Sequence, residues 1–460
     1  MGRIFGTDGA RGVANTEISC QLAMNIGRAM AMVLAERIGK RPTILIGKDT
    51  RISSDMLEAA LTAGVSSVGA DVIVAGVLPT PAVAFLITNA HADGGIMISA
   101  SHNPYEFNGI KIFGNEGYKL TDEEEFEIEE IILDKVKPYS LRWGWELGRI
   151  TRDETLWEKY IQYLSSTIEG DLSGLRVVVD CSNGSASATA AHLFDKLGCD
   201  VTILNNQPNG VNINRDCGST HIEKLAEVVR ENGYDVGVAF DGDADRCLAV
   251  DETGHIVDGD VMMAIMATHL KKQGKLVNNT IVATVMSNMG LLRFARENGF
   301  VVETTKVGDR YVLETMLKKG YNLGGEQSGH MILHDHMTSG DGQLTAIQLL
   351  SVMKQTGKKL SELSGVMTVY PQVMLGFRAD SVMKSKLDVD AGALKIIQKA
   401  KDQLGENGRV LIRASGTEPL IRVMLEGESL EEITSLAQET AANLEERLSN
   451  NEDCKKLEGF

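Results

Sequence analysis

The sequence predicts an α/β protein: three related α/β domains with mixed sheets, plus a smaller C-terminal α+β domain, around a central cleft. Its 460 residues, 43% hydrophobic and 24% charged, have globular composition and a length typical of several domains. A strand–helix–strand pattern occurs three times, and a different order of elements follows it near the C-terminus.

The repeated pattern is a β-branched run, a polar loop, an amphipathic helix, a glycine and a second β-branched run. The three copies cover residues 43–74, 177–203 and 281–304. Gly69, Gly198 and Gly299 stand where each helix should end, since glycine readily adopts the left-handed backbone of a helix C-cap. Each unit implies a right-handed parallel crossover, so three copies predict three related domains. Because the copies share a pattern and not residue identity, one larger α/β sheet is the alternative.

From about residue 371 the pattern changes to strand, helix, two strands and helix. These elements are expected at residues 373–377, 391–404, 409–414, 420–426 and 430–448. This order favours an antiparallel sheet in a small α+β domain. The predicted domains are therefore residues 1–152, 153–254, 255–369 and 370–460.

Charge and cysteine content limit the partners and the compartment. A formal net charge of −17 disfavours nucleic acid and membrane surfaces as partners, and an anionic substrate needs a locally basic cleft. No apolar run reaches the roughly 18–20 residues of a membrane helix, and the N-terminus lacks the apolar core of a secretory signal. Six cysteines without a paired spacing predict reduced thiols, so we expect a cytoplasmic protein.

The sharpest motif is Gly95-Ile-Met-Ile-Ser-Ala-Ser-His-Asn-Pro104. An apolar strand ends there in a polar loop, and α/β proteins place ligands in loops at the carboxyl ends of parallel strands. Ser101 in this loop is a candidate nucleophile if its neighbours orient it and remove its proton. The alternative is a hydrogen-bonded turn in which Ser101 and Asn103 only satisfy backbone groups.

A second motif, Asp241-Gly-Asp-Ala-Asp-Arg246, directly follows a predicted strand. Alternate residues of a near-extended chain face one side, so Asp241, Asp243 and Asp245 converge. Three close carboxylates raise one another's pKa, and a hard divalent cation removes this conflict. Ligation by oxygen atoms alone favours Mg²⁺. The alternative is an acidic surface turn.

Two further loops offer groups that bind a polar ligand. In Gly324-Gly-Glu-Gln-Ser-Gly-His330, glycines let the backbone approach a ligand and other side chains match hydroxyls; a glycine-rich connection is the alternative. Arg413-Ala-Ser-Gly-Thr-Glu-Pro419 joins arginine, hydroxyls and a turn into a candidate phosphate site, or else a polar hairpin. The basic residues expected to supply the cleft are Arg11, Arg51, Lys306 and Arg310.

Together the four motifs resemble the α-D-phosphohexomutase superfamily, in the same order and over essentially the whole chain. The resemblance makes Ser101 the phosphoserine, residues 241–246 the magnesium loop, residues 325–330 the sugar loop and residues 413–419 the phosphate loop. It implies an enzyme, an intramolecular phosphotransferase of the isomerase class, with a phosphosugar substrate.

The resemblance also implies a role for individual residues. Ligands of one Mg²⁺ per active site would be Ser101, Asp241, Asp243 and Asp245, with Arg246 beside them. Candidates for catalysis are Ser101, Arg11, His102, which would orient the phosphoserine, and Lys111 and His330, which would transfer protons. Residues that would bind the substrate are Lys306, Glu326, Ser328, Arg413, Ser415, Gly416, Thr417 and Arg422.

Two details are similar to the branch of the superfamily that acts on glucosamine phosphates: Gln327, and the segment Asn212-Ile-Asn-Arg-Asp-Cys-Gly-Ser-Thr-His221. That branch implies interconversion of glucosamine 6-phosphate and glucosamine 1-phosphate through glucosamine 1,6-bisphosphate, toward amino-sugar nucleotides such as UDP-N-acetylglucosamine. It also implies activation by glucosamine 1,6-bisphosphate or glucose 1,6-bisphosphate, and a homodimer. The alternatives are a phosphomannomutase/phosphoglucomutase for neutral hexoses, a metal-dependent phosphatase with an aspartate nucleophile, and a non-catalytic phosphosugar sensor.

Overall fold

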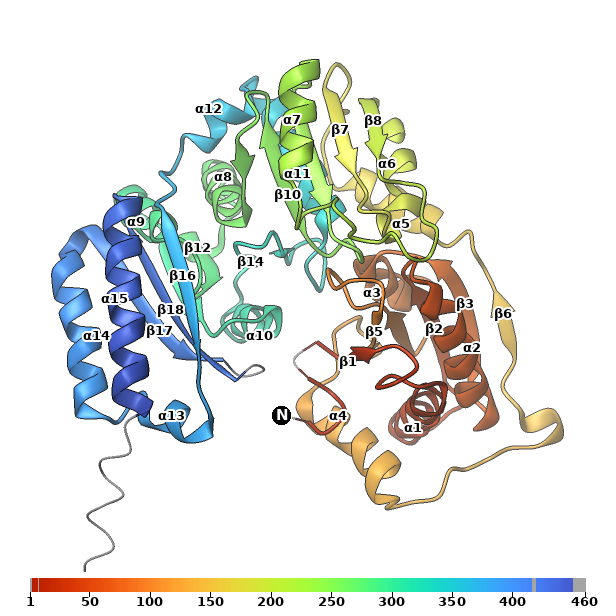
Figure 1. The fold of residues 1–460 in the computed structure, drawn as a ribbon. Helices are drawn as coiled ribbons and strands as arrows, with labels where there is room; N and C mark the ends of the chain where they lie inside the picture. Colours follow the sequence, from red (N-terminus) through yellow and green to blue (C-terminus); the bar gives the residue numbers. More distant parts are fainter. Residues whose placement is uncertain (1, 7, 416–418, 450–460) are drawn as a thin grey trace, which may run out of the picture. The chain divides into compact units, whose positions relative to one another are not determined.

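The computed structural model describes residues 2–6, 8–415 and 419–449. They form two compact units, whose elements are labelled in Figure 1. The first unit runs to residue 287 and includes residues 299–366, and the second contains residues 288–298 and the chain from residue 367. The first unit carries three sheets and the second carries one.

The first sheet is mixed and has the strand order β1-β5-β4-β2-β3-β6. Its strands are β1 (Ala10–Val13), β2 (Thr43–Lys48), β3 (Asp71–Val77), β4 (Gly94–Ile98), β5 (Phe107–Phe113) and β6 (Ile150–Arg152). The helices of this part are α1 (Cys20–Ile38), α2 (Ile52–Ser67), α3 (Thr80–Asn89), α4 (Asp122–Glu129) and α5 (Trp157–Ser166). Strand β2 pairs in parallel with β3 and β4, whereas β5 pairs antiparallel with β1 and β4.

Alternate residues of the central strands face two different helical layers. Ile44 and Ile46 of β2 lie in one hydrophobic cluster with Ile26 of α1 and Leu57 of α2. Gly47 faces the other way, and a Cβ atom there would lie 2.4 Å from a Val83 methyl group of α3. The strand period of two therefore places α1 and α2 on one face and α3 on the other. This leaves the loop after β4 at the carboxyl edge of a covered sheet.

The second and third sheets complete the first unit. The second has the order β11-β10-β9-β7-β8 and the third β13-β12-β14-β15. Their strands are β7 (Arg176–Asp180), β8 (Asp200–Leu204), β9 (Val236–Phe240), β10 (Cys247–Asp251), β11 (Ile256–Val257), β12 (Thr280–Thr284), β13 (Val301–Thr305), β14 (Leu323–Gly325) and β15 (Met331–Leu333). Their helices are α6 (Ala190–Lys196), α7 (Glu223–Asn232), α8 (Gly259–Lys272), α10 (Asp309–Lys319), α11 (Gly342–Thr356) and α12 (Leu360–Ser364). The second sheet extends to Val257, three residues past the domain boundary expected at residue 254.

The three predicted strand–helix–strand copies are present in three separate sheets, so the alternative of one larger sheet is excluded. The pairs β2–β3, β7–β8 and β12–β13 are all parallel. Gly69, Gly198 and Gly299 have φ values of 93°, 79° and 68°, the left-handed backbone expected where the helices end.

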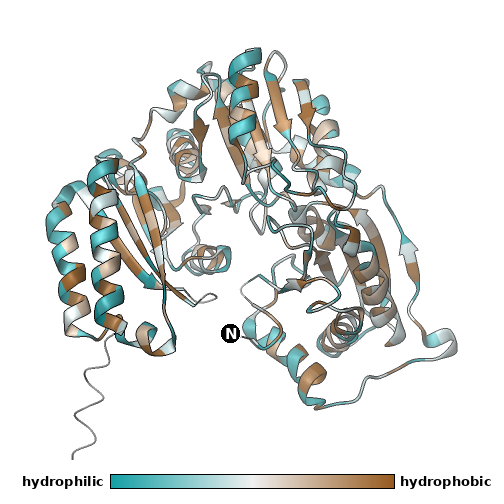
Figure 2. Cartoon of the chain, viewed as in Figure 1, coloured by the Kyte–Doolittle hydropathy of each residue, from teal (hydrophilic) through white to brown (hydrophobic). Residues whose placement is uncertain are grey.

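The second unit has the predicted antiparallel sheet, in the order β16-β18-β17. Its elements are α9 (Met289–Asn298), β16 (Gln372–Arg378), α13 (Ser381–Lys386), α14 (Ala391–Leu404), β17 (Gly408–Ala414), β18 (Leu420–Gly427) and α15 (Leu430–Ser449). Hydrophilic and hydrophobic residues alternate along α14 and α15 (Figure 2), because one side of each helix packs on the sheet. Helix α9, the helix of the third strand–helix–strand copy, belongs to this unit.

Two findings concern the helices and the cysteines. Within the described part of the chain, the helices are too short or too polar to cross a bilayer. The five cysteines in the described ranges are free thiols, and Cys454 lies outside them.

Glu426 on β18 makes the stability of the second unit depend on pH. Its side chain is completely buried, and burial outweighs the Arg409 guanidinium 3.4 Å away, raising the pKa of Glu426 to about 7. The folded chain then holds a proton that the unfolded chain has lost above about pH 4.5. Stability from this group is therefore present below that pH and is lost as pH rises through about 7.

We expect Glu426→Gln to reduce the loss of unfolding free energy between pH 5 and pH 8 by about 1–3 kcal/mol, because glutamine does not titrate. Urea denaturation followed by circular dichroism at both pH values measures this. The control is Glu428→Gln, which removes an exposed carboxylate two residues away. An unchanged pH difference in Glu426→Gln would show that Glu426 does not titrate in this range.

Candidate active site

The loop after β4 holds Ser101 in a buried and strained conformation. Ser101 has a φ of 50°, in the left-handed region that residues with a side chain rarely adopt. Its Oγ donates a hydrogen bond to Oδ2 of Asp241, 2.6 Å away. Its backbone N–H donates to Ser99 Oγ at 3.0 Å, and Ser99 Oγ donates to Asp49 Oδ2 at 2.6 Å. The hydroxyl of Ser101 thus points at the acidic motif and does more than satisfy backbone groups.

Arg51 supports this loop from inside the protein. We expected Arg51 to contribute to a basic cleft, and this was wrong, because its side chain is completely buried. Its Nε lies 2.8 Å from Asp49 Oδ2, and its Nη2 donates to the carbonyl oxygens of Ser101 and Asn103, both at 2.8 Å. The buried Asp49 carboxylate draws the guanidinium inward, since a buried charge requires a partner.

The three aspartates after β9 form one buried cluster, which excludes the exposed acidic turn. One oxygen atom from each carboxylate lies within 4.8 Å of the others. Burial and the charges of Asp245 and Asp243 raise the pKa of Asp241 well above its ordinary value. In the described part of the chain, Oδ1 of Asp243 and Oδ1 of Asp245 are buried without a hydrogen-bond partner. Such oxygen atoms are the donor set that a hard divalent cation takes, so the cluster fits a metal ion.

Lys111 of β5 reaches this aspartate cluster from the first sheet. Its Nζ lies 2.8 Å from Asp243 Oδ2, 3.4 Å from Asp245 Oδ2 and 3.2 Å from Asp8 Oδ2. Thr80, at the start of α3, donates from Oγ1 to Asp243 Oδ2 at 2.6 Å. Burial opposes the charge of Lys111, but the three carboxylates outweigh burial and raise its pKa. Lys111 is therefore an ammonium ion at neutral pH.

Arg11 and Arg246 place guanidinium groups near Ser101. Burial and the charges of Arg246 and Arg11 lower the pKa of His102 to about 4, so both arginines act on the residue next to Ser101. The Nδ1 atom of His102 lies 3.3 Å from Ser101 Oγ. The Nε atoms of both arginines are buried and have no hydrogen-bond partner among the described residues. Buried guanidinium N–H groups without acceptors suit an anion, and they supply the local positive charge that an acidic protein needs.

His330 connects the aspartate cluster to a second group of charges. Its Nδ1 lies 3.7 Å from Asp245 Oδ1, and its Nε2 lies 3.7 Å from Asp309 Oδ2. Burial opposes the charge of His330, but Asp245 and Asp309 outweigh it and raise its pKa to about 9. Lys119 bridges this second group, donating to Asp309 at 2.6 Å and to Asp8 at 2.5 Å. His330 is thus mainly protonated at neutral pH.

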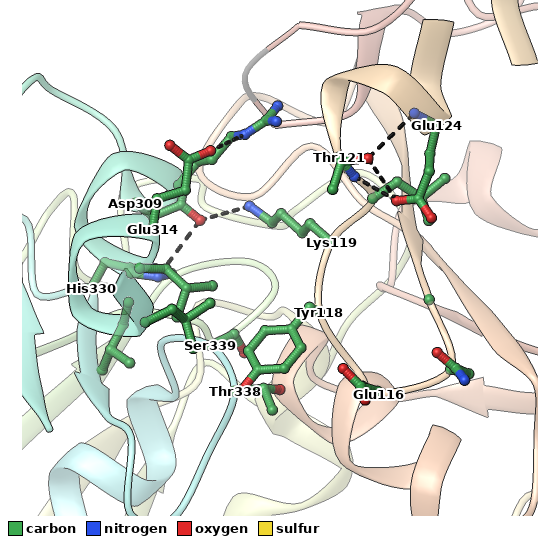
Figure 3. Close-up of a pocket in the computed structure, with 17 residues that line it drawn as sticks. Glu116, Tyr118, Lys119, Thr121, Glu124, Asp309, Glu314, His330, Thr338 and Ser339 are labelled. Atoms are coloured by element: carbon green, nitrogen blue, oxygen red, sulfur yellow. Dashed lines mark hydrogen bonds and ion pairs between the residues drawn. The ribbon is translucent and has the colours of Figure 1, made fainter. Parts of the chain in front are cut away.

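Asp309 and His330 also line a cavity of about 550 Å³ between the chain around Lys119 and helix α10 (Figure 3). Lys119 reaches across this cavity to Asp309, and Tyr118 and Ser339 form another part of its wall. Sequence reasoning did not assign roles to Lys119 or Asp309. Each stands outside the glycine- and serine-rich loops that marked the other candidates, so only the fold identifies them.

The glycine-rich loop before His330 lies beside the aspartate cluster. The N–H of Cys247, just after residues 241–246, donates to the carbonyl oxygen of Gly329 at 3.0 Å. Burial opposes the charge of Arg246, but the charges of Asp241, Asp245 and Glu326 outweigh burial and raise the pKa of Arg246. Glu326 Oε1 also accepts the N–H of Gly308 at 3.0 Å.

Two other residues of the first unit that were expected to bind substrate are more exposed than the aspartate cluster. The side chains of Ser328 and Lys306 are accessible to solvent, and Lys306 Nζ lies 5.9 Å from the ring centre of Tyr311. Gln327 turns inward, donating from Nε2 to Asp258 Oδ2 at 3.1 Å. Gln327 therefore fixes the loop at the start of α8. Arg310 contacts Asp122 and Glu314 and lines the cavity next to Asp309.

The second unit carries the remaining candidates. Arg413 of β17 and Arg422 of β18 are direct partners in the antiparallel register, so two guanidinium groups project from neighbouring strands. Burial and the charge of Arg422 lower the pKa of Arg413. Ser415 is buried just beyond β17. Gly416 and Thr417 lie outside the described residues.

Comparisons with known families and structures give a consistent result. Residues 2–138, 158–254 and 258–370 match the descriptions "Phosphoglucomutase/phosphomannomutase, alpha/beta/alpha" domains I, II and III, and residues 359–443 match the C-terminal domain of the same family. The chain is 55% identical to a phosphoglucosamine mutase of Acetivibrio thermocellus, over 97% of this chain and 100% of that one. It is 54% identical to a phosphoglucosamine mutase of Caldicellulosiruptor bescii, over 98% and 100%.

Two solved structures have the same fold. A phosphoglucomutase/phosphomannomutase family protein of Burkholderia thailandensis is 24% identical, with a TM-score of 0.81 over 97% of this chain and 98% of that one. An N-acetylphosphoglucosamine mutase of Aspergillus fumigatus, in complex with GlcNAc-6P and magnesium, is 16% identical, with a TM-score of 0.66 over 96% and 95%. At these identities the two structures support the fold alone.

Proposed function

Because the chain belongs to the phosphoglucomutase/phosphomannomutase family, we propose that it interconverts glucosamine 6-phosphate and glucosamine 1-phosphate. It is then an isomerase that transfers a phosphoryl group through a phosphoserine. The observation that carries this proposal is the hydrogen bond of 2.6 Å between Ser101 Oγ and Asp241, inside a buried carboxylate cluster that fits a metal ion. A nucleophile beside a cation site is the arrangement that phosphoryl transfer requires.

The reaction has two half-steps that use the same serine. In the first, the bond between phosphorus and Ser101 Oγ breaks and a new bond forms between phosphorus and the free O1 or O6 of the substrate. The proton of that sugar hydroxyl passes to a base of the site, and Ser101 Oγ takes a proton and becomes a free hydroxyl. The glucosamine 1,6-bisphosphate then turns end for end. In the second, Ser101 Oγ loses its proton to a base and forms a bond to the phosphorus of the other phosphoryl group, the bond between that phosphorus and the sugar oxygen breaks, and the sugar oxygen takes a proton.

The residues around Ser101 would stabilise the charge of the phosphoryl group in different ways. Asp241, Asp243, Asp245 and an oxygen of the phosphoserine would hold one Mg²⁺, which when bound neutralises charge on the phosphoryl oxygens. Arg11 and Arg246 would direct their free Nε–H groups at the same oxygens. Lys111 would contribute charge, because its raised pKa makes it a poor proton donor and leaves no free base at neutral pH.

The protonated His330 is our candidate to give the leaving sugar oxygen its proton, since its pKa of about 9 keeps the imidazolium form available near neutral pH. His102 stays neutral and would orient the phosphoserine through Nδ1. Glu326, Ser328 and Lys306 would bind the sugar. The spectator phosphate is assigned to the pair Arg413 and Arg422, together with Ser415 and the neighbouring Gly416 and Thr417.

The remaining parts of the proposal come from the family and the sequence. They are activation by glucosamine 1,6-bisphosphate or glucose 1,6-bisphosphate, a homodimer in the cytoplasm, and four domains with the boundaries predicted above. The formal net charge of −17 supports a small-molecule partner over nucleic acid.

Substrate choice is tested by steady-state kinetics with Mg²⁺ and a bisphosphate activator. We expect kcat/KM for glucosamine 6-phosphate to exceed the values for glucose 6-phosphate and mannose 6-phosphate at least about tenfold, or 1.4 kcal/mol. Equal or higher values for a neutral hexose phosphate would assign the chain to the phosphomannomutase/phosphoglucomutase activity. Release of inorganic phosphate without isomerisation would instead support a phosphatase.

A further inference from the structure

The backbone around Ser101 is held by two buried donors that act on the same two carbonyl groups. Arg51 Nη2 donates to the carbonyl oxygens of Ser101 and Asn103, both at 2.8 Å. Asn214 Nδ2 donates to the same two oxygens, at 2.9 Å and 3.1 Å. A carbonyl oxygen has two lone pairs, so both acceptors are fully used. Rotation of these peptide groups therefore breaks several buried hydrogen bonds at once.

Asn214 comes from a distant part of the chain and is itself fixed. It is buried and has a φ of 58°, a conformation that asparagine tolerates better than most residues. Its N–H donates to the carbonyl oxygen of Ser182 at 2.9 Å. The carboxylate of Asp180, at the end of β7, accepts the N–H groups of Ser182 and Gly218 at 2.8 Å and 3.0 Å. The second sheet thus provides a rigid base for the Asn214 amide.

The loop that carries the three aspartates packs directly against the hydrogen bond between Asn214 and the carbonyl oxygen of Ser101. A Cβ atom at Gly242, between two of the aspartates, would lie 2.5 Å from the carbonyl oxygen of Ser101 and 2.9 Å from Asn214 Nδ2. Only glycine leaves room for the chain at this distance. Asn214 therefore lies where the serine loop and the metal-ligand loop meet, so a shift of its amide changes the distance between Ser101 and Asp241.

We propose that Asn214 is a positioning residue for phosphoryl transfer: with Arg51, it locks the backbone of residues 101–103 so that Ser101 Oγ stays at the aspartate cluster. Asn214 touches no reacting atom, and its role rests on the proposed function. A displacement of the nucleophile by about 1 Å can lower the rate of phosphoryl transfer about 100-fold. Loss of the hydrogen bonds from Asn214 to these carbonyl oxygens therefore reduces kcat and leaves KM unchanged.

The test uses two substitutions with opposite chemistry. Asn214→Gly keeps the left-handed backbone and removes the amide, and we expect kcat to fall about 10- to 100-fold with KM within about twofold. Asn214→Asp keeps the shape and sets a carboxylate against two carbonyl oxygens, so kcat should fall further. The matched controls are Asn205→Gly and Asn205→Asp, at an exposed asparagine with a φ of 48°, and they should match the parent.

Two further measurements separate positioning from general destabilisation. Hydrogen exchange by mass spectrometry should show exchange in residues 99–104 at least about tenfold faster in Asn214→Gly, whichever sugar the enzyme takes. The Mg²⁺-induced rise in Tm should persist, because the aspartates remain. Unchanged exchange in residues 99–104, a kcat within twofold of the parent, or a loss confined to KM would each overturn the proposal. Absence of mutase turnover in the parent protein would overturn the proposed function instead. The hydrogen-exchange result would still test whether Asn214 holds the backbone of residues 101–103.

Discussion

Replacement of Ser101 by alanine is expected to lower mutase turnover about 10⁴-fold or more and to remove the covalent phosphate from the protein. The Ser101 hydroxyl is the group that carries the phosphoryl between half-reactions, and the remaining residues only position and stabilise it. The buried Oγ of Ser101 lies 2.6 Å from Asp241 Oδ2, whereas the hydroxyl of Thr80 donates to Asp243 Oδ2. Intact-mass analysis for one phosphate, together with turnover of glucosamine 6-phosphate, measures both effects.

A folding control accompanies the Ser101→Ala result. Asp241, Asp243 and Asp245, three of the four proposed ligands of Mg²⁺, remain in Ser101→Ala, so this variant should still show a Tm increase with Mg²⁺. Turnover near the parent level in Ser101→Ala would exclude a phosphoserine enzyme. Phosphate release that survives in this variant would then point to an aspartate of residues 241–246 as the nucleophile of a phosphatase.

Asp241→Asn is expected to lower mutase activity without lowering the stability of the metal-free protein. Burial and two neighbouring carboxylates destabilise the charge of Asp241 in the metal-free protein, as its raised pKa indicates. Asparagine removes that charge, so the Tm of the metal-free protein should stay equal or rise. Mutase activity should fall about 10³-fold or more, because several kcal/mol of charge stabilisation are lost with the metal.

Metal binding gives the direct readout of Asp241→Asn. The parent should gain about 2.7 kcal/mol of stability at a Mg²⁺ concentration 100 times the Kd, measured as a shift in Tm. Asp241→Asn should lose most of that shift. The control is Asp216→Asn, which removes one exposed carboxylate from a left-handed position and leaves the cluster intact. A full Mg²⁺ shift in Asp241→Asn would show that this carboxylate is not a ligand.

The serine and aspartate motifs were predictable because their chemistry is local. Each follows an apolar strand within a few residues, and the carboxyl edge of a sheet is where a short loop can present side chains. Asp241, Asp243 and Asp245 are close in sequence and do converge, but through a turn and not through the near-extended chain that we expected: Ala244 has a φ of 56°, and its N–H donates to the carbonyl oxygen of Asp241 at 3.1 Å. The same reasoning could not find Lys119 or Asp309, whose partners are distant in sequence.

Arg51 shows why exposure could not be predicted from a motif. One partner, Asp49, lies only two residues away, but the sequence does not show that this carboxylate is itself buried. The other partners, the carbonyl groups of the loop of residues 101–107, lie about fifty residues away. Asn214 is a related case: the segment 212–221 marked a branch of the family, but its contact with Ser101 depends on how the first and second sheets pack.

The sequence by itself determined the three strand–helix–strand units, the antiparallel sheet near the C-terminus, and the choice of Ser101 and the three aspartates as candidate site residues. These follow from periodicity, glycine positions and short-range spacing, which act within one element and its loop. The tertiary structure alone decided which charges meet: Lys111 as a buried ammonium ion, His330 between two carboxylates, and the amide of Asn214 behind Ser101. Such pairings depend on distances between residues far apart in the chain, and burial then sets their protonation and their partners.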